Sequence, residues 1–218
     1  LNNVYMWIVS LGKGFCLGFA AYFVGFVMDL TISQSSFLSM MKEIPKQTID
    51  AYYTIQKNLL LISPVVYMVN DQYLINHETS SVNYTHVVML LLIHHIGYYV
   101  VHRSMHQIKM LRKYHDYHHE FVKHLCPSIG NAVSFPEFTL AYILPFITGA
   151  YLIRPNEVTF IIPIGFISVF NNIIHCKELR DLPWSPFLVS PNMHIKHHEI
   201  RNKHFSAPIL NLDYFIEK

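Results

Sequence analysis

The chain has 218 residues, of which 52% are hydrophobic and only 14% are charged. Soluble domains carry about 25% charged residues, so this composition excludes disordered, collagen-like and coiled-coil chains and favours a membrane protein. The formal net charge of +2 is too small to indicate a nucleic-acid partner, and the three cysteines form no CxxC pair that would indicate a disulfide framework or a thiolate zinc site.

The first apolar stretch, residues 4–28, predicts a membrane-spanning helix. It is apolar except for Lys13 and a few Ser and Gly residues. This length suffices for a hydrocarbon core of about 30 Å, which needs about 20 helical residues. A signal peptide is the alternative, but it would have a shorter apolar core followed by a small-residue cleavage site.

Four further apolar stretches predict the rest of a helical membrane stem. The last two are separated by only a short polar segment, so we expect them to form a helical hairpin. Together with the first stretch they predict an all-α, multispanning fold of about four to five helices. The four stretches cover residues 58–69, 86–101, 138–153 and 157–173.

The basic residues are distributed unevenly between the two ends of these helices. Fourteen of the sixteen Lys and Arg residues lie in segments 31–57, 102–137 and 174–218, whereas the opposite loops, 70–85 and 154–156, hold only Arg154. Cytosolic loops of membrane proteins are enriched in Lys and Arg. We therefore expect the three basic segments to lie on the cytosolic side.

Histidine is unusually abundant, with fifteen residues that mostly fall into three clusters. Residues three or four positions apart share a helix face, so each cluster can present at least two imidazoles to one point. In the second cluster His115 can pair with either His118 or His119, and in the third His194 can pair with either His197 or His198. Eight imidazoles are too many for one ion and suit two neighbouring ions. The clusters are His102 and His106, then His115, His118 and His119, then His194, His197 and His198.

The donor type narrows the choice of metal. Imidazole suits zinc, copper, iron and nickel, and no Glu-x-x-His pair of the soluble di-iron bundles accompanies these histidines. An all-imidazole set is neutral, so it needs water, hydroxide or oxide as a counter-charge and can bind dioxygen if the metal is iron. A hydrolytic dizinc site and a pH-sensing surface are weaker alternatives. Isolated histidines are expected to be surface or capping residues: His77, His86, His124 and His204.

The order HxxxH, HxxHH, HxxHH in a multispanning protein resembles the fatty acid hydroxylase superfamily, which comprises integral-membrane di-iron oxygenases such as sterol desaturases and 4-methyl sterol oxidases. The similarity runs from about residue 55 to the end. Residues 98–106 resemble the family's YW-x-HR-x-x-H, and residues 115–120 resemble its H-x-x-HHE. Residues 181–187 are similar to the DxPWSPF of the sterol oxidase branch, and residues 194–198 to the family's HDYHH.

This resemblance implies a membrane stem with a cytosolic histidine-rich cap that holds two iron ions. Residues 1–218 would form a single domain, with an N-terminal membrane segment and linker (1–57) and a catalytic region (58–218). The resemblance also makes His175 a ninth ligand. The implied metal ligands are His102, His106, His115, His118, His119, His175, His194, His197 and His198.

The same resemblance implies an O₂-dependent oxidoreductase that hydroxylates or desaturates a lipid, either sterol-like or fatty acyl, in the endoplasmic reticulum membrane. The chain carries no haem or flavin motif, so electrons would come from NAD(P)H through cytochrome b5 or a reductase. Lys109, Arg112, Lys113 and Lys123 either steer an acidic donor or serve only as topology residues. A lipid would need a route from the bilayer to the site, and two roles are open for four aromatic residues: they either line this route or serve as plain packing. These residues are Tyr98, Tyr99, Phe135 and Phe187.

The chain departs from the family pattern at several positions. His95 stands where the family usually has Asp, Phe135 stands where many members have His, and residues 177–178 replace a Gly-Tyr pair. His95 is either a hydrogen-bond acceptor for a ligand, a metal ligand, or a buried and satisfied histidine. Pro136 and Glu137 fall where the family has a Pro-x-Glu element. The eight clustered histidines are complete, so metal binding is expected.

Two functions compete with the oxygenase. One is a metal-binding membrane protein of the same fold without turnover. The other is a metal transporter, which would place ionisable residues in the middle of its spans. Here the histidines lie at or beyond the ends of the apolar stretches, with only His94 and His95 near a membrane boundary. This distribution disfavours transport.

Overall fold

The computed structural model describes residues 2–216, which fold into helices and contain no β-strand. Two isolated backbone bridges, one between Asn76 and Asn156 and one between Leu188 and Leu210, join loops. The predicted all-α class is therefore confirmed. The helices are α1 (Asn2–Thr31), α2 (Gln34–Glu43), α3 (Pro45–Gln56), η1 (Lys57–Ile62), α4 (Ser63–Tyr73), α5 (Tyr84–Gln107), α6 (Lys109–His115), η2 (His118–His124), η3 (Pro127–Asn131), α7 (Phe135–Glu137), η4 (Phe138–Ile143), α8 (Leu144–Ile153), α9 (Glu157–Ile174), η5 (Lys177–Leu179), α10 (Pro191–Ile200) and α11 (Asp213–Ile216).

Four helices are long and apolar enough to cross a membrane, so the chain is a multi-pass membrane protein. They cover Val4–Thr31, Tyr84–Gln107, Phe135–Ile153 and Glu157–Ile174. The predicted stretch 58–69 is not among them. It lies in η1 and α4, where polar residues bound the apolar sequence and keep it short: Asn58 begins it, and Asn70 and Asp71 follow it.

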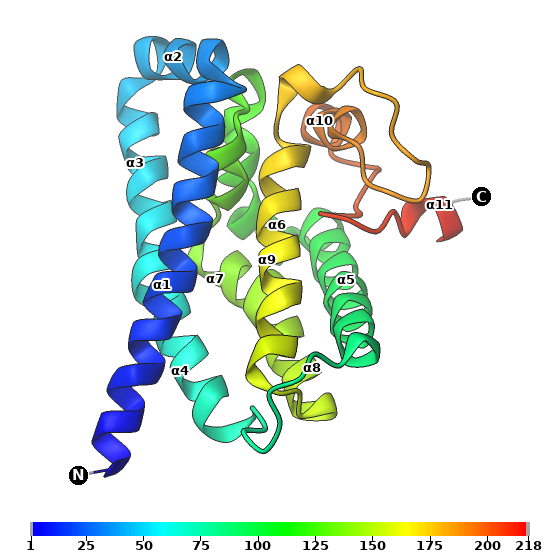
Figure 1. Cartoon of the computed structure of the whole chain (residues 1–218). Helices are drawn as coiled ribbons and strands as arrows, with labels where there is room; N and C mark the ends of the chain where they lie inside the picture. Colours follow the sequence, from blue (N-terminus) through cyan, green and yellow to red (C-terminus); the bar gives the residue numbers. More distant parts are fainter. Residues whose placement is uncertain (1, 217–218) are drawn as a thin grey trace.

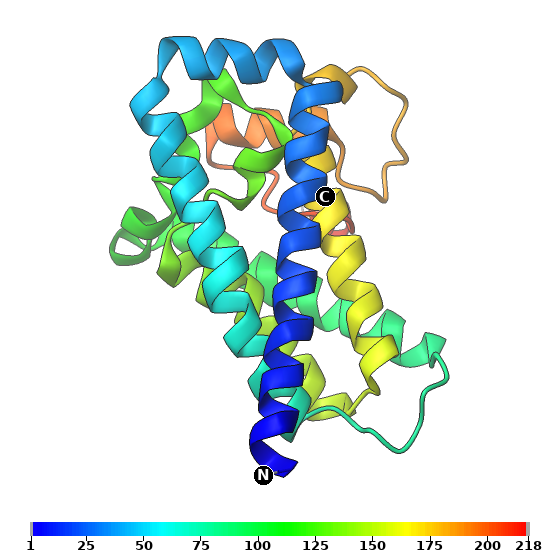
Figure 2. The ribbon, with the colours of Figure 1, turned by 60° about the vertical axis from the view of Figure 1, so that its left-hand side comes forward.

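The N-terminal half forms a helical pair. α1 runs the length of the molecule, α2 crosses its upper end, and α3, η1 and α4 return beside α1 (Figure 2). Glycines allow this close approach. A Cβ atom at Gly18 would lie 1.9 Å from the Leu59 carbonyl oxygen, and one at Gly14 would lie 2.8 Å from the Cα of Pro64. Small residues of this kind let membrane helices pack backbone to backbone.

The second half places every histidine cluster at one end of the stem. α5 rises, the chain forms the upper region, and η4 and α8 descend before α9 rises again (Figure 1). The predicted hairpin turns at Arg154, which adopts a left-handed conformation with φ 50°, and Asn156 caps α9 by accepting a hydrogen bond from the Thr159 N–H at 2.9 Å. That this histidine-rich end faces the cytosol stays a prediction.

The charge inside the first span has a partner. Lys13 Nζ lies 2.6 Å from Oε1 of Glu157, which is the first residue of α9. The hydroxyl of Tyr67, in α4, donates to the same oxygen at 2.7 Å. Ionisable side chains in membrane segments generally pair in this way. This contact joins three helices at the end of the stem opposite the histidines.

Candidate metal centre

Five buried histidines form the first metal-ligand group. Their Nε2 atoms converge: His115 Nε2 lies 2.9 Å from that of His102 and 2.9 Å from that of His119. His106 Nε2 lies 3.3 Å from that of His102 and 3.1 Å from that of His197. One ligand atom from each residue lies within 4.8 Å of every other. The group is large enough to surround one metal ion.

A break after α5 brings the first two motifs together. His102 and His106 lie one turn apart near the C-terminal end of α5, so their rings share a face. Ile108 is extended, with ψ 112°, and α6 then folds back so that His115 meets His102. The side chain of Arg112 supports the turn by donating from Nη2 to the His106 carbonyl at 2.7 Å.

Four buried histidines form the second group. His175 Nε2 lies 3.0 Å from His194 Nε2 and 3.3 Å from His118 Nε2, and His198 Nε2 lies 3.2 Å from His194 Nε2. His175 is the C-cap of α9, and α10 carries His194 and His198. The structure thus brings His175, singled out by resemblance alone, into a second set that could hold a metal.

Each HxxHH motif is divided between the two groups. His115 and His119 belong to the first group and His118 to the second, while His194 and His198 belong to the second group and His197 to the first. The i,i+4 partner therefore shares the group in both motifs, and the residue before it faces the neighbouring group. The two groups adjoin, because the ring centroids of His119 and His198 are 4.5 Å apart.

The other ring nitrogens fix the direction of the lone pairs. Nδ1 of His102, His175 and His197 lies 2.7 Å, 2.6 Å and 2.8 Å from the carbonyl oxygens of Phe205, Asn171 and Lys203. A carbonyl oxygen only accepts, so each Nδ1 must carry the proton and each Nε2 must carry a lone pair. Lone pairs that face one another repel unless a cation lies between them. This arrangement fits bound metal ions.

Glu137 supports the first group from α7. Its Oε1 accepts a 2.6 Å hydrogen bond from His115 Nδ1, and both side chains are almost fully buried. A carboxylate in this position sets the tautomer of a ligand histidine and raises its basicity. The sequence marked Glu137 only as part of a Pro-x-Glu element; an acidic residue at the start of an apolar stretch is the signal that points to such a role. Ser134 caps this short helix by accepting from the Glu137 N–H at 3.3 Å.

Burial keeps these histidines neutral. It lowers the pKa of His175 to about 4, and it lowers the pKa of His115, His118, His194 and His198 well below 6.5. Neighbouring imidazoles add to the effect, because a second positive charge in the same group is unfavourable. Neutral imidazole is the form that binds metals.

Comparison with known proteins agrees with this geometry. The sequence model described as fatty acid hydroxylase matches residues 87–217, which include all nine histidines of the two metal-ligand groups. The chain belongs to the fatty acid hydroxylase family. No curated protein matches the chain, and no solved structure does. Members of the fatty acid hydroxylase family are generally hydroxylases or desaturases and typically depend on iron.

In the described part of this family member, the remaining histidines lie outside both groups. His95 is buried and satisfied: its Nδ1 lies 2.6 Å from the Leu91 carbonyl oxygen, and its Nε2 accepts from the Ile209 N–H at 3.2 Å. It therefore tethers the C-terminal segment to α5. His77 Nε2 lies 2.9 Å from the Asp71 carbonyl oxygen, and His124 Nε2 lies 3.7 Å from a Glu43 carboxylate oxygen.

Aromatic side chains wall the first group. The Tyr98 ring lies 5.1 Å from that of His102, and the Phe205 ring lies 5.4 Å from that of His106. Of the four aromatic side chains considered for a lipid route, Tyr98 and Tyr99 are buried, whereas Phe135 and Phe187 are about half exposed. None of the four lines the pocket inside the membrane stem, whose walls come from other residues of α1, α4, η4, α8 and α9, among others.

Proposed function

We propose that this chain is a membrane-bound di-iron oxidoreductase that uses O₂ to hydroxylate or desaturate a lipid. The observation that carries the proposal is the convergence of Nε2 atoms in two adjoining groups of five and four buried histidines. Structural zinc takes four ligands in nearly every case, so a five-imidazole group beside a second one argues for another metal. Imidazole suits iron, and the family is typically iron-dependent.

Iron bound at these histidines would supply the redox chemistry that activates O₂. The protein's own residues hold and shield the site. His102, His118 and His194 are each at most 2% exposed, which excludes bulk water. Tyr98 and Phe205 give the first group an apolar wall that suits a hydrocarbon substrate. Glu137 accepts the hydrogen bond from His115 Nδ1 and so orients the His115 ring.

The reaction needs an external reductant. Insertion of one oxygen atom into a C–H bond consumes O₂, two electrons and two protons, and releases water. We propose that NAD(P)H supplies the electrons through cytochrome b5 or a reductase. The exposed basic side chains beside the site, Lys109, Arg112, Lys113 and Lys123, offer a surface for an acidic donor.

We place the protein in the endoplasmic reticulum membrane with its histidine-rich end in the cytosol. The four candidate spans and the concentration of basic residues at the histidine-rich end support this orientation. A cytosolic site would also be accessible to soluble reductants. The DLPWSPF segment, residues 181–187, favours a sterol-like lipid over a free fatty acid by resemblance.

Lipid mass spectrometry on yeast that express the chain tests this proposal. The control is the double variant His197→Ala, His198→Ala, which removes one imidazole from each group. A lipid that gains one oxygen only with the intact chain is the expected result for a hydroxylase. A lipid that loses two hydrogens identifies a desaturase. Full lipid oxidation by the double variant would refute the assignment.

A metal-binding protein without turnover gives a different result. It would bind iron in the intact chain and leave the host lipids unchanged, even after supply of sterols and fatty acids that yeast lacks. Iron measured in the same membranes therefore separates loss of turnover from loss of metal.

A further inference from the structure

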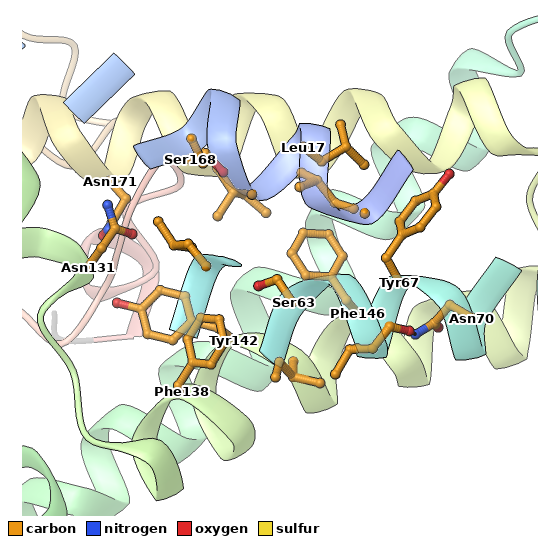
Figure 3. A pocket seen from close by; sticks show the side chains of 18 of the residues that line it. Leu17, Ser63, Tyr67, Asn70, Asn131, Phe138, Tyr142, Phe146, Ser168 and Asn171 are labelled. Atoms are coloured by element: carbon orange, nitrogen blue, oxygen red, sulfur yellow. Dashed lines mark hydrogen bonds between the residues drawn. The ribbon is translucent and has the colours of Figure 1, made fainter. Parts of the chain in front are cut away.

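An elongated pocket lies inside the membrane stem, below the metal centre. The space between its walls is about 840 Å³ when the open solvent at its mouth is included, and the walls are formed by α1, η1, α4, η3, η4, α8 and α9. Apolar side chains make up most of its wall, among them Leu17, Phe138, Phe146 and Phe160. Figure 3 shows Asn131 and Asn171 at one end of this pocket and Tyr67 and Asn70 at the other.

The two π-helical segments of the described chain both border this pocket. η1 contributes Leu59, and η4 contributes Phe138, Tyr142 and Ile143. A π-helical turn widens a helix and is found frequently at functional sites. Both segments thus open space inside the stem where continuous α-helices would pack closely.

One end of the pocket approaches the metal centre. Asn171 lines this end, and its carbonyl oxygen accepts from His175 Nδ1 at 2.6 Å. Tyr142 also lines it and packs on Tyr98 with ring centroids 5.2 Å apart, and Tyr98 in turn packs on His102. Asn171 alone therefore separates this end from the second histidine group, whereas two successive rings, those of Tyr142 and Tyr98, separate it from the first.

The opposite end carries an unpaired hydrogen-bond acceptor. Asn70 is 2% exposed, and its Nδ2 donates to the Val66 carbonyl at 2.8 Å. This bond fixes the amide orientation, because a flipped amide would set two acceptors against each other. The Oδ1 atom is buried and has no hydrogen-bond partner in residues 2–216. A buried acceptor without a partner is costly, so this atom is suited to a donor on a ligand.

A seam between α1 and α9 offers an entrance from the bilayer. A second hollow lies there and shares Leu17, Ala21, Ile164 and Ser168 with the pocket. Gly165 also lines this hollow, and a Cβ atom on it would meet no atom within 4 Å. The seam is therefore loosely packed, unlike the contact between α1 and α4.

We propose that this pocket binds a lipid alcohol, with its hydroxyl donating to Asn70 Oδ1 and its apolar body extending toward Tyr142. Asn70 lies near the polar layer formed by Lys13, Glu157 and Tyr67, which suits a lipid head, and the long apolar wall suits a hydrocarbon body. As the substrate site, the pocket rests on the proposed function. It then directs oxidation to the part of the lipid remote from the hydroxyl.

Binding of tritiated cholesterol and 1-hexadecanol to the purified, metal-loaded protein in nanodiscs tests the site and identifies the kind of alcohol. We expect saturable binding of at least one of them. Asn70→Leu should weaken that binding by about two- to tenfold, the worth of one hydrogen bond. The methyl ether of the same alcohol cannot donate, so it should bind less tightly and be insensitive to Asn70→Leu. Equal loss for alcohol and ether, or no binding of either alcohol, would overturn the proposal.

A second pair of variants guards against a folding defect. Ser168→Phe fills the pocket, whereas Thr148→Phe places the same ring on the exposed face of α8. Only Ser168→Phe should abolish binding, with metal content unchanged in both; unimpaired binding by Ser168→Phe would overturn the proposal. If lipid oxidation persists without alcohol binding, the pocket assignment is wrong while the proposed function stands. Alcohol binding without oxidation would support the site while the proposed function fails.

Discussion

The buried hydrogen bond between His115 Nδ1 and Glu137 Oε1, 2.6 Å long, ties the second histidine motif to the start of a membrane-spanning helix. Through it, the position of the stem determines the orientation of a metal-ligand candidate in the upper region. The other Glu137 oxygen, Oε2, has no hydrogen-bond partner in the described residues. Among the described residues, the Glu137 carboxyl group is therefore hydrogen-bonded only to His115.

Replacing Glu137 should weaken metal binding at the first group. Glu137→Leu leaves the His115 N–H unpaired, and loss of such a support typically costs 10–100-fold in metal affinity. Glu137→Gln retains an acceptor and should cost less. Titration of the apo-protein with Co²⁺, followed by its visible absorption, measures both. The exposed neighbour Glu120→Gln is the control, and an equally small effect of all three changes would contradict the role.

Gly130 is expected to be essential for the second group. A Cβ atom there would lie 2.6 Å from His175 Nδ1, which is already held by the Asn171 carbonyl. Gly130→Ala should therefore displace His175 and selectively remove one metal ion per chain. Metal analysis of the purified variant checks this. The control is Gly165→Ala, whose added Cβ atom meets no atom within 4 Å, and it should retain both ions. If Gly130→Ala also retains both ions, the second group does not depend on the close contact between Gly130 and His175.

The apo-protein should lose stability in acid. The pKa of His175 falls from 6.5 in an unfolded chain to about 4 in the folded one, so between these values the unfolded state binds more protons. The neutral His175 therefore contributes about 3 kcal/mol to the free energy of unfolding. This contribution is complete above pH 6.5 and is lost as the pH falls through about 4. Thermal unfolding of chelator-treated protein in detergent between pH 7.5 and about 4 measures the effect. A flat melting temperature across that range would contradict neutral burial.

The Lys13–Glu157 ion pair should stabilise the stem. Lys13→Met leaves the Glu157 carboxylate with only the Tyr67 hydroxyl and should lower stability by about 1–3 kcal/mol. Adding Glu157→Gln removes the unpaired charge and should restore part of the loss. Melting temperatures of the single and double variants give the coupling. Purely additive losses would show that the two residues do not interact.

Cysteine labelling in sealed microsomes checks the orientation. Arg180 is exposed at the histidine-rich end and Glu78 is exposed in the opposite loop. With exposed Cys16 replaced by Ala, Arg180→Cys should react with an impermeant maleimide directly, and Glu78→Cys only after permeabilisation. The reverse pattern would place the histidines in the lumen.

The spacing of histidines predicted that the clusters supply shared metal sites, and its physical basis is simple. Residues four apart on a helix share a face, and the pairs His102 with His106, His115 with His119 and His194 with His198 behave so. Spacing did not assign His118 and His197 to their groups. That depends on how α6, η2 and α10 pack against one another, which no local pattern contains.

Contacts between distant segments explain what the sequence left open. Lys13 is an isolated charge in an apolar stretch until α9 brings Glu157 beside it. His95 is a candidate ligand until the Ile209 N–H is seen to occupy its Nε2. The segment 58–69 has the apolar composition of a span, but its one asparagine makes a contact inside the stem: Asn58 Nδ2 donates to the Val133 carbonyl at 2.8 Å.

The iron content of the purified chain tests the central claim most directly. Elemental analysis of protein from iron-supplied cells should give two iron ions per chain, both for the intact protein and for the control His86→Ala, a histidine outside both groups. The pair His115→Ala, His119→Ala and the pair His194→Ala, His198→Ala should each leave one. One iron in the intact chain, or two in either paired variant, would contradict the assignment of two metal ions to two histidine groups.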